Sequence, residues 1–236
     1  MALPSLKTTN YELEIPSLSE KVTYRPFLVK EQKQLMIASE GNNQKEIMNA
    51  ICNLISSCVD MPYDPMTLPM FDIEYMFIQL RTKSVGSEIK LKLLCPDDNE
   101  TYAETHISLD DVEIIVNDDH TNIINLTDDI GLTMSYPTLK DTSEVTTIER
   151  NNVDQSFKLI NYCILNIFDK ENVYDRTTMS ENELSNFIDE MNMDQLQKVQ
   201  SFFETMPKTH LKVMVKNPKT EVESEVILEG MQNFLG

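Results

Sequence analysis

The first candidate for chemistry in this sequence is a cysteine in a polar loop, Cys95-Pro96-Asp97-Asp98. A Cys-Pro-x-Cys turn would place two thiolates within reach of one zinc ion, which structural sites hold with four ligands. Here position 98 is Asp, and no second cysteine follows it. We therefore predict no metal at this loop, and we expect strand pairing and core packing to hold the hairpin around it.

Two acidic clusters, Asp118-Asp119-His120 and Asp128-Asp129, are the other candidates. A metal-dependent hydrolase could use carboxylates and an imidazole of this kind, and the Asp118–His120 region carries that alternative function. Catalytic carboxylates, however, need surroundings that separate their pKa values, and the sequence around both clusters is polar. We therefore interpret both clusters as solvated turns and assign no catalytic residue.

The signatures of common catalytic and cofactor sites are missing from the sequence. None of the patterns HExxH, GxSxG, GxGxxG or the P-loop occurs, and the three histidines, His106, His120 and His210, show no ligand spacing. Five glycines and no tryptophan are also not typical of a nucleotide-binding enzyme. These features predict a protein without a metal, without cofactors and without enzymatic activity.

Composition restricts the partners. The net charge of −19 repels nucleic-acid phosphates and anionic lipid, so we expect neither nucleic acid nor a membrane as a direct partner. An acidic surface either serves solubility or meets basic surfaces on partner proteins. The four scattered cysteines form no disulfide framework, and residues 1–16 lack the apolar stretch of a signal peptide. A cytoplasmic protein is the resulting expectation.

One pattern occurs twice in the chain, at Leu68–Val112 and at Met191–Met231. In each segment a helix rich in Phe and Met ends in a short break. An alternating strand then turns through a polar loop with Pro and Asn before a return strand. The two segments match in pattern and only weakly in identity, which indicates a shared architecture rather than a proven duplication. We predict an α+β fold of helical layers with antiparallel β-hairpins, organised as two helix-plus-hairpin units.

Hydrophobic periodicity predicts the individual elements. The segment Phe71–Lys83 is apolar over most of its circumference, so we expect this helix to be central. In the first predicted helix, Val29–Ser39, Leu35 and Met36 are expected to face inward. The further predicted elements are a strand at Tyr11–Ile15 and helices at Val29–Ser39, Gln44–Val59, Val153–Phe168, Ser180–Glu190 and Gln195–Met206.

Polar composition and prolines indicate the domain boundaries. A linker is predicted at residues 139–152, because Leu139–Asn151 is polar and rich in Thr and Glu. Whether the lobes on its two sides pack as one domain stays open at this level. The full prediction is an N-terminal arm at 1–21, a lobe with the helix pair, the central helix and the first hairpin at 22–138, the linker at 139–152, and a lobe with the remaining helices and the second hairpin at 153–236.

An ordered series of five stretches extends from near residue 22 to near residue 234. The stretches are Arg25–Glu31 (RPFLVKE), Leu68–Tyr75 (LPMFDIEY), Leu80–Gly86 (LRTKSVG), Phe202–Lys208 (FFETMPK) and Leu228–Met231 (LEGM). In order and spacing, this series resembles the baseplate hub and hub-assembly proteins of T4-type tailed phages.

The resemblance implies a non-enzymatic phage tail protein, either a baseplate hub component or a hub-assembly factor. Such a protein would bind other phage baseplate hub proteins, with the tape-measure protein as a further partner. It would act in the host cytoplasm during assembly, and a structural subunit would stay in the virion tail baseplate whereas a chaperone would leave. The alternatives are the hydrolase described above and an acidic protein-binding adaptor unrelated to phage tails.

Four residues of the predicted central helix are candidates for partner binding: Phe71, Tyr75, Arg81 and Lys83. Arg81 and Lys83 lie at the break between helix and hairpin, where they can pair with partner carboxylates. The competing interpretation is that both cations complement the helix dipole at its C-terminal end. The edges of the two hairpins are a second candidate surface, because an exposed edge can accept a strand from a partner.

Overall fold

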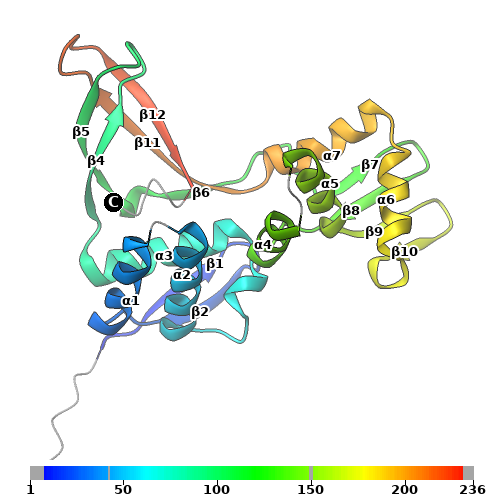
Figure 1. The fold of residues 1–236 in the computed structure, drawn as a ribbon, viewed down its shortest axis with the longest axis horizontal. Helices are drawn as coiled ribbons and strands as arrows, with labels where there is room; N and C mark the ends of the chain where they lie inside the picture. Colours follow the sequence, from blue (N-terminus) through cyan, green and yellow to red (C-terminus); the bar gives the residue numbers. More distant parts are fainter. Residues whose placement is uncertain (1–7, 42, 149–150, 231–236) are drawn as a thin grey trace, which may run out of the picture. The chain divides into compact units, whose positions relative to one another are not determined.

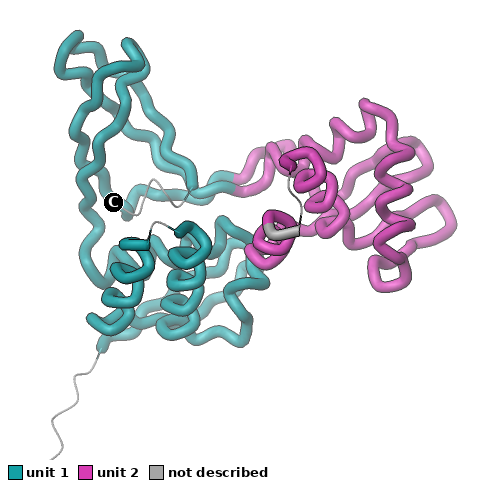
Figure 2. The backbone as a smooth tube through the Cα atoms, in the orientation of Figure 1, with its two compact units in different colours: residues 1–115, 208–236 teal, residues 116–207 magenta. Residues whose placement is uncertain are grey.

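The computed structural model describes residues 8–41, 43–148 and 151–230, and in it the chain forms the predicted α+β fold with antiparallel sheets. The chain divides into two compact units, unit 1 with residues 1–115 and 208–236 and unit 2 with residues 116–207 (Figure 2). Unit 2 is therefore an insertion between two strands of unit 1. This division differs from the expected boundaries, and it separates the helix of the second predicted helix-plus-hairpin unit from its hairpin.

Unit 1 combines three helices on a small sheet with two long hairpins (Figure 1). Its strands are β1 (Tyr11–Ile15), β2 (Glu20–Tyr24), β3 (Val59–Asp60), β4 (Glu88–Leu94), β5 (Tyr102–Ser108), β6 (Glu113–Ile115), β11 (Lys208–Lys216) and β12 (Glu223–Glu229). Its helices are α1 (Val29–Glu40), α2 (Gln44–Cys58) and α3 (Met70–Val85), with short 3₁₀ turns at Pro65–Thr67 and Leu109–Asp111.

The small sheet has the strand order β1-β2-β3 and is buried on one face. Leu13 and Ile15 on β1, and Val22 and Tyr24 on β2, alternate with exposed residues, as strands require when only one face is covered. Their buried side chains share a core with α2 and α3. The predicted strand Tyr11–Ile15 and the apolar stripe of the second helix are thus confirmed.

Helix α3 is central, as its sequence predicts. Its apolar residues contribute to two separate cores: Ile73 and Phe77, among others, to the core with the small sheet, and Ile78 to the core between the hairpins. A helix that is apolar all round is stable in water only when it is covered on more than one side. The buried residues of α3 are Phe71, Asp72, Ile73, Glu74, Met76, Phe77, Ile78, Leu80 and Thr82.

Two buried carboxylates on α3 connect it to distant parts of unit 1. Asp72 accepts hydrogen bonds from the backbone N–H of Ser17, at 3.0 Å, and from the Ser17 hydroxyl, in the turn between β1 and β2. Glu74 accepts a hydrogen bond from the hydroxyl of Thr209 at the start of β11. Since a buried polar group without a partner is costly, these bonds define where the turn and the strand must lie against α3.

The two hairpins, β4–β5 and β11–β12, pack against each other (Figure 1). The inward-facing residues of both hairpins form one core, in which Ile89 and Ile107 of the first meet Val213 and Leu228 of the second. Strand β6 adds to the free edge of β11, with Ile115 opposite Lys208. The repeat detected in the sequence is therefore a pair of hairpins that bury their apolar faces together.

The loops at the tips of the hairpins begin with the same kind of turn, although the first loop, residues 95–101, is one residue longer than the second, residues 217–222. In each loop the fifth residue, Asn99 or Glu221, has a positive φ, 53° and 63° respectively. Its N–H donates to the carbonyl of the residue four positions earlier, Cys95 or Asn217, at 2.9 Å in both. Cys95 and Asn217 thus occupy equivalent buried positions, although only one of them carries a thiol.

The two tips are joined through Asp97. The Asn217 amide donates to both carboxylate oxygens of Asp97, at 3.0 and 3.1 Å, and the hydroxyl of Thr220 donates at 2.5 Å. These hydrogen bonds from Thr220 and Asn217 lower the pKa of Asp97. These side-chain hydrogen bonds connect the two tips, in addition to the strand pairing and core packing expected within the hairpin.

Unit 2 is a four-stranded antiparallel sheet, in the order β10-β9-β8-β7, with helices packed on it (Figure 1). Leu132 and Ile167 of the sheet share a core with Ile160, Leu184 and Phe202 from three helices. The elements are β7 (Ile123–Asn125), β8 (Gly131–Met134), α4 (Leu139–Ile148), α5 (Asn152–Cys163), β9 (Ile164–Phe168), β10 (Val173–Asp175), a 3₁₀ turn at Arg176–Thr178, α6 (Glu181–Asp189) and α7 (Met193–Thr205).

The helix predicted at Val153–Phe168 is wrong in its last five residues. Helix α5 ends at Cys163, and Ile164–Phe168 form the strand β9 between β8 and β10. A β-bulge shifts the register, so that Ile164 pairs with Met134 while Asn166 pairs with Thr133. The extra residue brings Ile164 and Ile167 to the same buried face. Their spacing of three therefore imitates a helical stripe.

The predicted linker at 139–152 contains a helix instead. Helix α4 spans Leu139–Ile148, and its residues Leu139 and Val145 are buried. Its start carries a reciprocal cap, because the hydroxyl of Thr138 donates to Asp141 at 2.6 Å and the Asp141 N–H donates back to that hydroxyl at 3.1 Å. The pattern Thr-x-x-Asp is a helix-start signal, which the polar composition of this segment obscures.

Replacing Asn217 tests the connection between the hairpin tips. The buried amide donates twice to Asp97, and its oxygen accepts from the N–H groups of Lys219 and Thr220. We expect Asn217→Ala to lower the free energy of unfolding by about 2 kcal/mol, measured by urea denaturation. The neighbouring exposed control Lys219→Ala should change it by less than about 0.5 kcal/mol. Equal effects of the two changes would contradict this account.

Candidate functional site

The structure places the four predicted partner-binding residues in different environments along α3. Phe71 is buried, with an exposed fraction of 4%, and is not accessible from outside in this conformation. Tyr75 is half-buried, and burial together with Glu14 raises its pKa. Arg81 is half-buried, whereas Lys83 is exposed, with its Nζ 5.8 Å from the ring centroid of Tyr11. Of the four, Arg81 is the residue that lines a groove.

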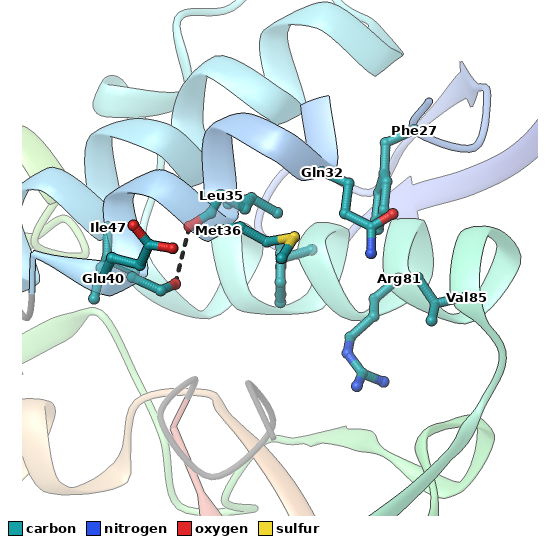
Figure 3. A pocket seen from close by; sticks show the side chains of 10 residues that line it. Phe27, Gln32, Leu35, Met36, Glu40, Ile47, Arg81 and Val85 are labelled. Carbon is teal, nitrogen blue, oxygen red and sulfur yellow. Dashed lines mark hydrogen bonds between the residues drawn. The ribbon is translucent and has the colours of Figure 1, made fainter. Parts of the chain in front are cut away.

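The groove lies between α1 and α3 and has a volume of about 520 Å³ (Figure 3). Its lining is mostly apolar. One phenylalanine comes from α3 and one from the segment before α1, and the other apolar side chains come from α1, α2 and α3. The polar residues are Gln32, Ser39, Glu40 and Arg81. The apolar residues are Phe27, Leu35, Met36, Ile47, Phe77 and Val85.

One wall of the groove, α1, is anchored by a buried ion pair at its start. Glu31, 3% exposed, accepts from Arg25 at 2.9 Å and from the N–H of Leu28 at 2.8 Å. Arg25 also donates to the carbonyl of Ser57 at the end of α2. Burial alone would raise the pKa of Glu31, but the hydrogen bonds from Arg25 and Leu28 lower it overall. This arrangement attaches α1 to α2 through charge.

Because polar bonds hold α1, its apolar side chains are not all used in the core. Leu35 is half-buried, but Met36 is 58% exposed, so the expectation that Met36 faces inward is wrong. Ile37 is 65% exposed as well. Three consecutive apolar residues, Leu35-Met36-Ile37, exceed what one contact face of a helix can bury. This run was the available signal for an apolar surface on α1.

Arg81 is the unusual polar group of the groove. Its Nη1 atom has no solvent exposure and no hydrogen-bond acceptor among the described residues, and none of the ion pairs there includes Arg81. Burial of the Arg81 guanidinium away from water lowers its pKa. A shielded donor without an acceptor is costly in a folded protein, and a bound water, an ion or a group of a partner can supply the missing acceptor.

The lining of the groove suits the binding of an apolar surface. Its lining contains neither cysteine nor histidine. Figure 3 shows Arg81 and Val85 toward one end and Glu40 and Ile47 toward the other, with Leu35 and Met36 between them. An occupant would bury apolar surface in the middle and would find one cation and one anion at opposite ends.

The hairpin edges, the second predicted surface, are also present. Strands β4 and β5 form a two-stranded sheet, and β12 is an edge of its sheet. The outward faces carry charge, with ion pairs from Lys90 to Glu104 and from Lys212 to Glu225. Charged side chains are a common means of protecting edges from added strands. The groove is therefore the better supported docking surface.

The acidic clusters of the hydrolase alternative do not assemble a catalytic constellation around His120. Its Nδ1 lies 2.9 Å from the Thr205 hydroxyl and its Nε2 lies 3.0 Å from the Tyr136 hydroxyl. Its ring forms a cluster with Tyr136 and Phe202, whose centroids lie 5.6 and 5.2 Å from it and 5.7 Å from each other. His120 follows the entry of the chain into unit 2, and Thr205 precedes the exit. The histidine thus connects the two ends of the inserted segment.

Cysteines and metal ligands offer no reactive centre either. The four cysteines are buried and free, and burial raises the pKa of Cys52 and Cys58 to about 11, so these thiols stay protonated at neutral pH. Within residues 8–41, 43–148 and 151–230, no three His, Cys, Asp or Glu side chains converge as metal ligands would.

A family model described as T4 bacteriophage base plate protein matches residues 8–236, nearly the whole chain. The chain belongs to this family. Neither the curated proteins nor the solved structures contain a significant match to it. The resemblance inferred from the five ordered stretches is thereby confirmed, and the protein is a T4-type baseplate protein.

Two of the five stretches that carry the resemblance contribute residues to the groove of this baseplate protein. Arg25–Glu31 contains the ion pair that anchors α1, and Leu80–Gly86 contains Arg81 and Val85. The residues that sequence reasoning missed are those of α1, mainly Gln32, Met36 and Glu40. None of the helices in the described part of the chain has the length and apolar character needed to cross a bilayer.

Removal of the Arg81 guanidinium should stabilise the baseplate protein. We expect Arg81→Met to raise the free energy of unfolding by about 1 kcal/mol, because it removes a shielded donor without an acceptor while keeping most of the packing of the side-chain stem. Urea denaturation measures the effect. The exposed cation two residues away provides the control, Lys83→Met, which should leave stability nearly unchanged. A clear loss of stability in Arg81→Met would show that the guanidinium serves the fold.

The environment of His120 predicts a pH dependence. Burial lowers the pKa of His120 below its ordinary value of 6.5. The unfolded chain then binds the proton more tightly than the folded chain, so stability is full above about pH 6.5 and falls as the pH drops through that value. We expect His120→Phe to reduce this dependence between about pH 7.5 and pH 5.5, measured by urea denaturation. An identical pH profile in the variant would contradict the assignment.

Proposed function

We propose that this baseplate protein is a non-enzymatic hub component or hub-assembly factor that binds other baseplate hub proteins. The observation that carries the proposal is the family match over nearly the whole chain. Support from the structure is the groove between α1 and α3, where apolar side chains lie beside Arg81, whose Nη1 atom has no acceptor among the described residues. The tape-measure protein is a further partner in this proposal, and binding begins in the host cytoplasm during assembly.

Within this proposal, the four candidate residues of α3 have different roles. Arg81 contacts the partner directly in the groove, and Lys83 contributes charge from the exposed surface nearby. Tyr75 is half-buried, so it can offer only part of its ring to a partner. Phe71 is buried and acts by positioning the first turn of α3 rather than by contact.

Deletion of the gene in the phage tests the function directly. We expect cells infected with the deletion phage to accumulate heads without complete tails, seen by electron microscopy, and to recover when the protein is supplied from a plasmid. Normal tails in its absence would overturn the proposal. Quantitative mass spectrometry of purified virions then separates the two roles, because a hub component is retained at a constant copy number and an assembly chaperone is absent.

Charge reversal at the C-terminal part of α3 tests the proposed contact residues. We expect Arg81→Glu combined with Lys83→Glu to reduce the yield of infectious particles at least tenfold, because repulsion replaces attraction at a desolvated contact. The fold should persist, as measured by circular dichroism and urea denaturation.

The matched control reverses two exposed lysines outside the groove lining, Lys33→Glu with Lys45→Glu. It changes the net charge by the same amount, so it should leave the particle yield close to that of the wild type. Equal losses for both double variants would reject a specific role for Arg81 and Lys83 and would point to net charge alone.

A further inference from the structure

We propose that the groove between α1 and α3 binds an amphipathic helix of a partner protein that places a carboxylate against Arg81. The inference rests on the proposed function and specifies the chemistry of the segment that docks. It follows from the unsatisfied donor, the lining, the secondary structure of the walls and the charges at the two ends.

The acceptor for Arg81 must come from outside the described part of the chain. A guanidinium presents its N–H groups in a planar fork that matches a carboxylate. In this structure the Nη1 atom is shielded from water and has no acceptor there. Glu40, the acidic residue of the groove, lies toward the opposite end (Figure 3) and makes no ion pair with Arg81. An incoming carboxylate would satisfy the fork and remove the cost of its desolvation.

The remainder of the occupant must be apolar. Phe27, Phe77, Leu35 and Ile47 line the groove, and Met36 and Val85 are 58% exposed at its wall. The volume of about 520 Å³ would also suit a small apolar ligand. However, the lining extends along α1 for about two turns, from Gln32 to Glu40, and Val29 is exposed about one turn before it. A polypeptide segment covers such an extended surface, and a small molecule does not.

A helix fits the groove better than an extended strand. The walls are helices, whose backbone groups are already paired within each helix. An extended segment would bury its own N–H and C=O groups, and the lining offers few side chains to pair with them. One of these, the Ser39 hydroxyl, already donates to the carbonyl of Leu35 at 2.9 Å. A helical segment satisfies its backbone internally and presents side chains alone.

The charges at the two ends determine the orientation of the helix. Arg81 and Glu40 lie toward opposite ends of the groove (Figure 3), so the complementary helix carries its acidic residue at the Arg81 end and a basic or neutral residue at the Glu40 end. The apolar side chains between them recur at spacings of three and four, which puts them on one face of the helix.

Selection from a peptide library tests this chemistry directly, since it requires no purified partner protein. Random peptides of about four helical turns are displayed and selected against the full chain. We expect the enriched peptides to carry apolar residues at helical spacing and one Asp or Glu near one end. A binding site mapped by photo-crosslinking should include α1 and α3. Enrichment of peptides without an acidic residue, or crosslinks outside these helices, would overturn the proposal.

A double-mutant cycle then measures the pairing with Arg81. For the tightest peptide, Arg81→Met should weaken binding about tenfold to a hundredfold, and so should an acid-to-amide change in the peptide. The two losses should not add, because they remove the same interaction. Lys45→Met, at an exposed lysine outside the groove lining, should keep the affinity, and Met36→Lys should reduce it while leaving stability nearly unchanged. Additive losses would overturn the pairing.

Other occupants give distinct results. If sedimentation shows a dimer of the full chain that dissociates in Arg81→Met, the occupant is a second copy and the partner-protein version is overturned. This test is independent of the proposed function. If the deletion phage fails to assemble tails but no acidic peptide is selected, the groove proposal is rejected and the proposed function stands. If tails are normal but an acidic peptide is selected, the proposed function is rejected and the groove proposal stands.

Discussion

Burial of α3 on more than one side is the constraint on which the rest of unit 1 depends. Helix α3 carries Ile73, Phe77 and Leu80 on one side and Ile78 on another, so it has no wide polar face to expose to water. The small sheet and the paired hairpins therefore both assemble on it. The two buried carboxylates also determine how these parts are positioned on α3. Ser17 must lie close enough to donate hydrogen bonds to Asp72, and Thr209 must lie close enough to donate one to Glu74.

The same helix also generates the candidate site at its C-terminal part. Toward that end the buried stripe continues, but α1 covers it incompletely, since a charged contact between Arg25 and Glu31 holds α1 rather than a full apolar face. The groove is what remains between the two helices. Arg81 borders this groove, and its Nη1 atom has no acceptor among the described residues. Its unsatisfied donor is consistent with a surface that is completed by binding, as expected in a protein whose family assembles into a baseplate.

The repeated sequence pattern corresponds to two real hairpins, but the second helix and the second hairpin of the pattern belong to different units. Both hairpins have the expected strands and equivalent tips, and each tip has one residue with positive φ. Yet α7, the helix of the second pattern, lies in unit 2, and its hairpin completes unit 1. The chain therefore closes unit 1 only after unit 2 has been made. The contact between Asn217 and Asp97 spans 120 residues of sequence, so no local pattern predicts it.

The sequence by itself determined those helices and strands whose buried faces follow from hydrophobic period and composition. The all-round apolarity of α3, the strand β1, the helix α2 and the start of α6 at Ser180 each correspond to what the structure contains. Only the tertiary structure decided the strand at Ile164–Phe168, the exposure of Met36 and the missing acceptor at Arg81. The physical reason is that burial and hydrogen-bond satisfaction belong to pairs of elements far apart in the chain. A sequence period shows which side chains share a face, and only packing shows whether that face is covered.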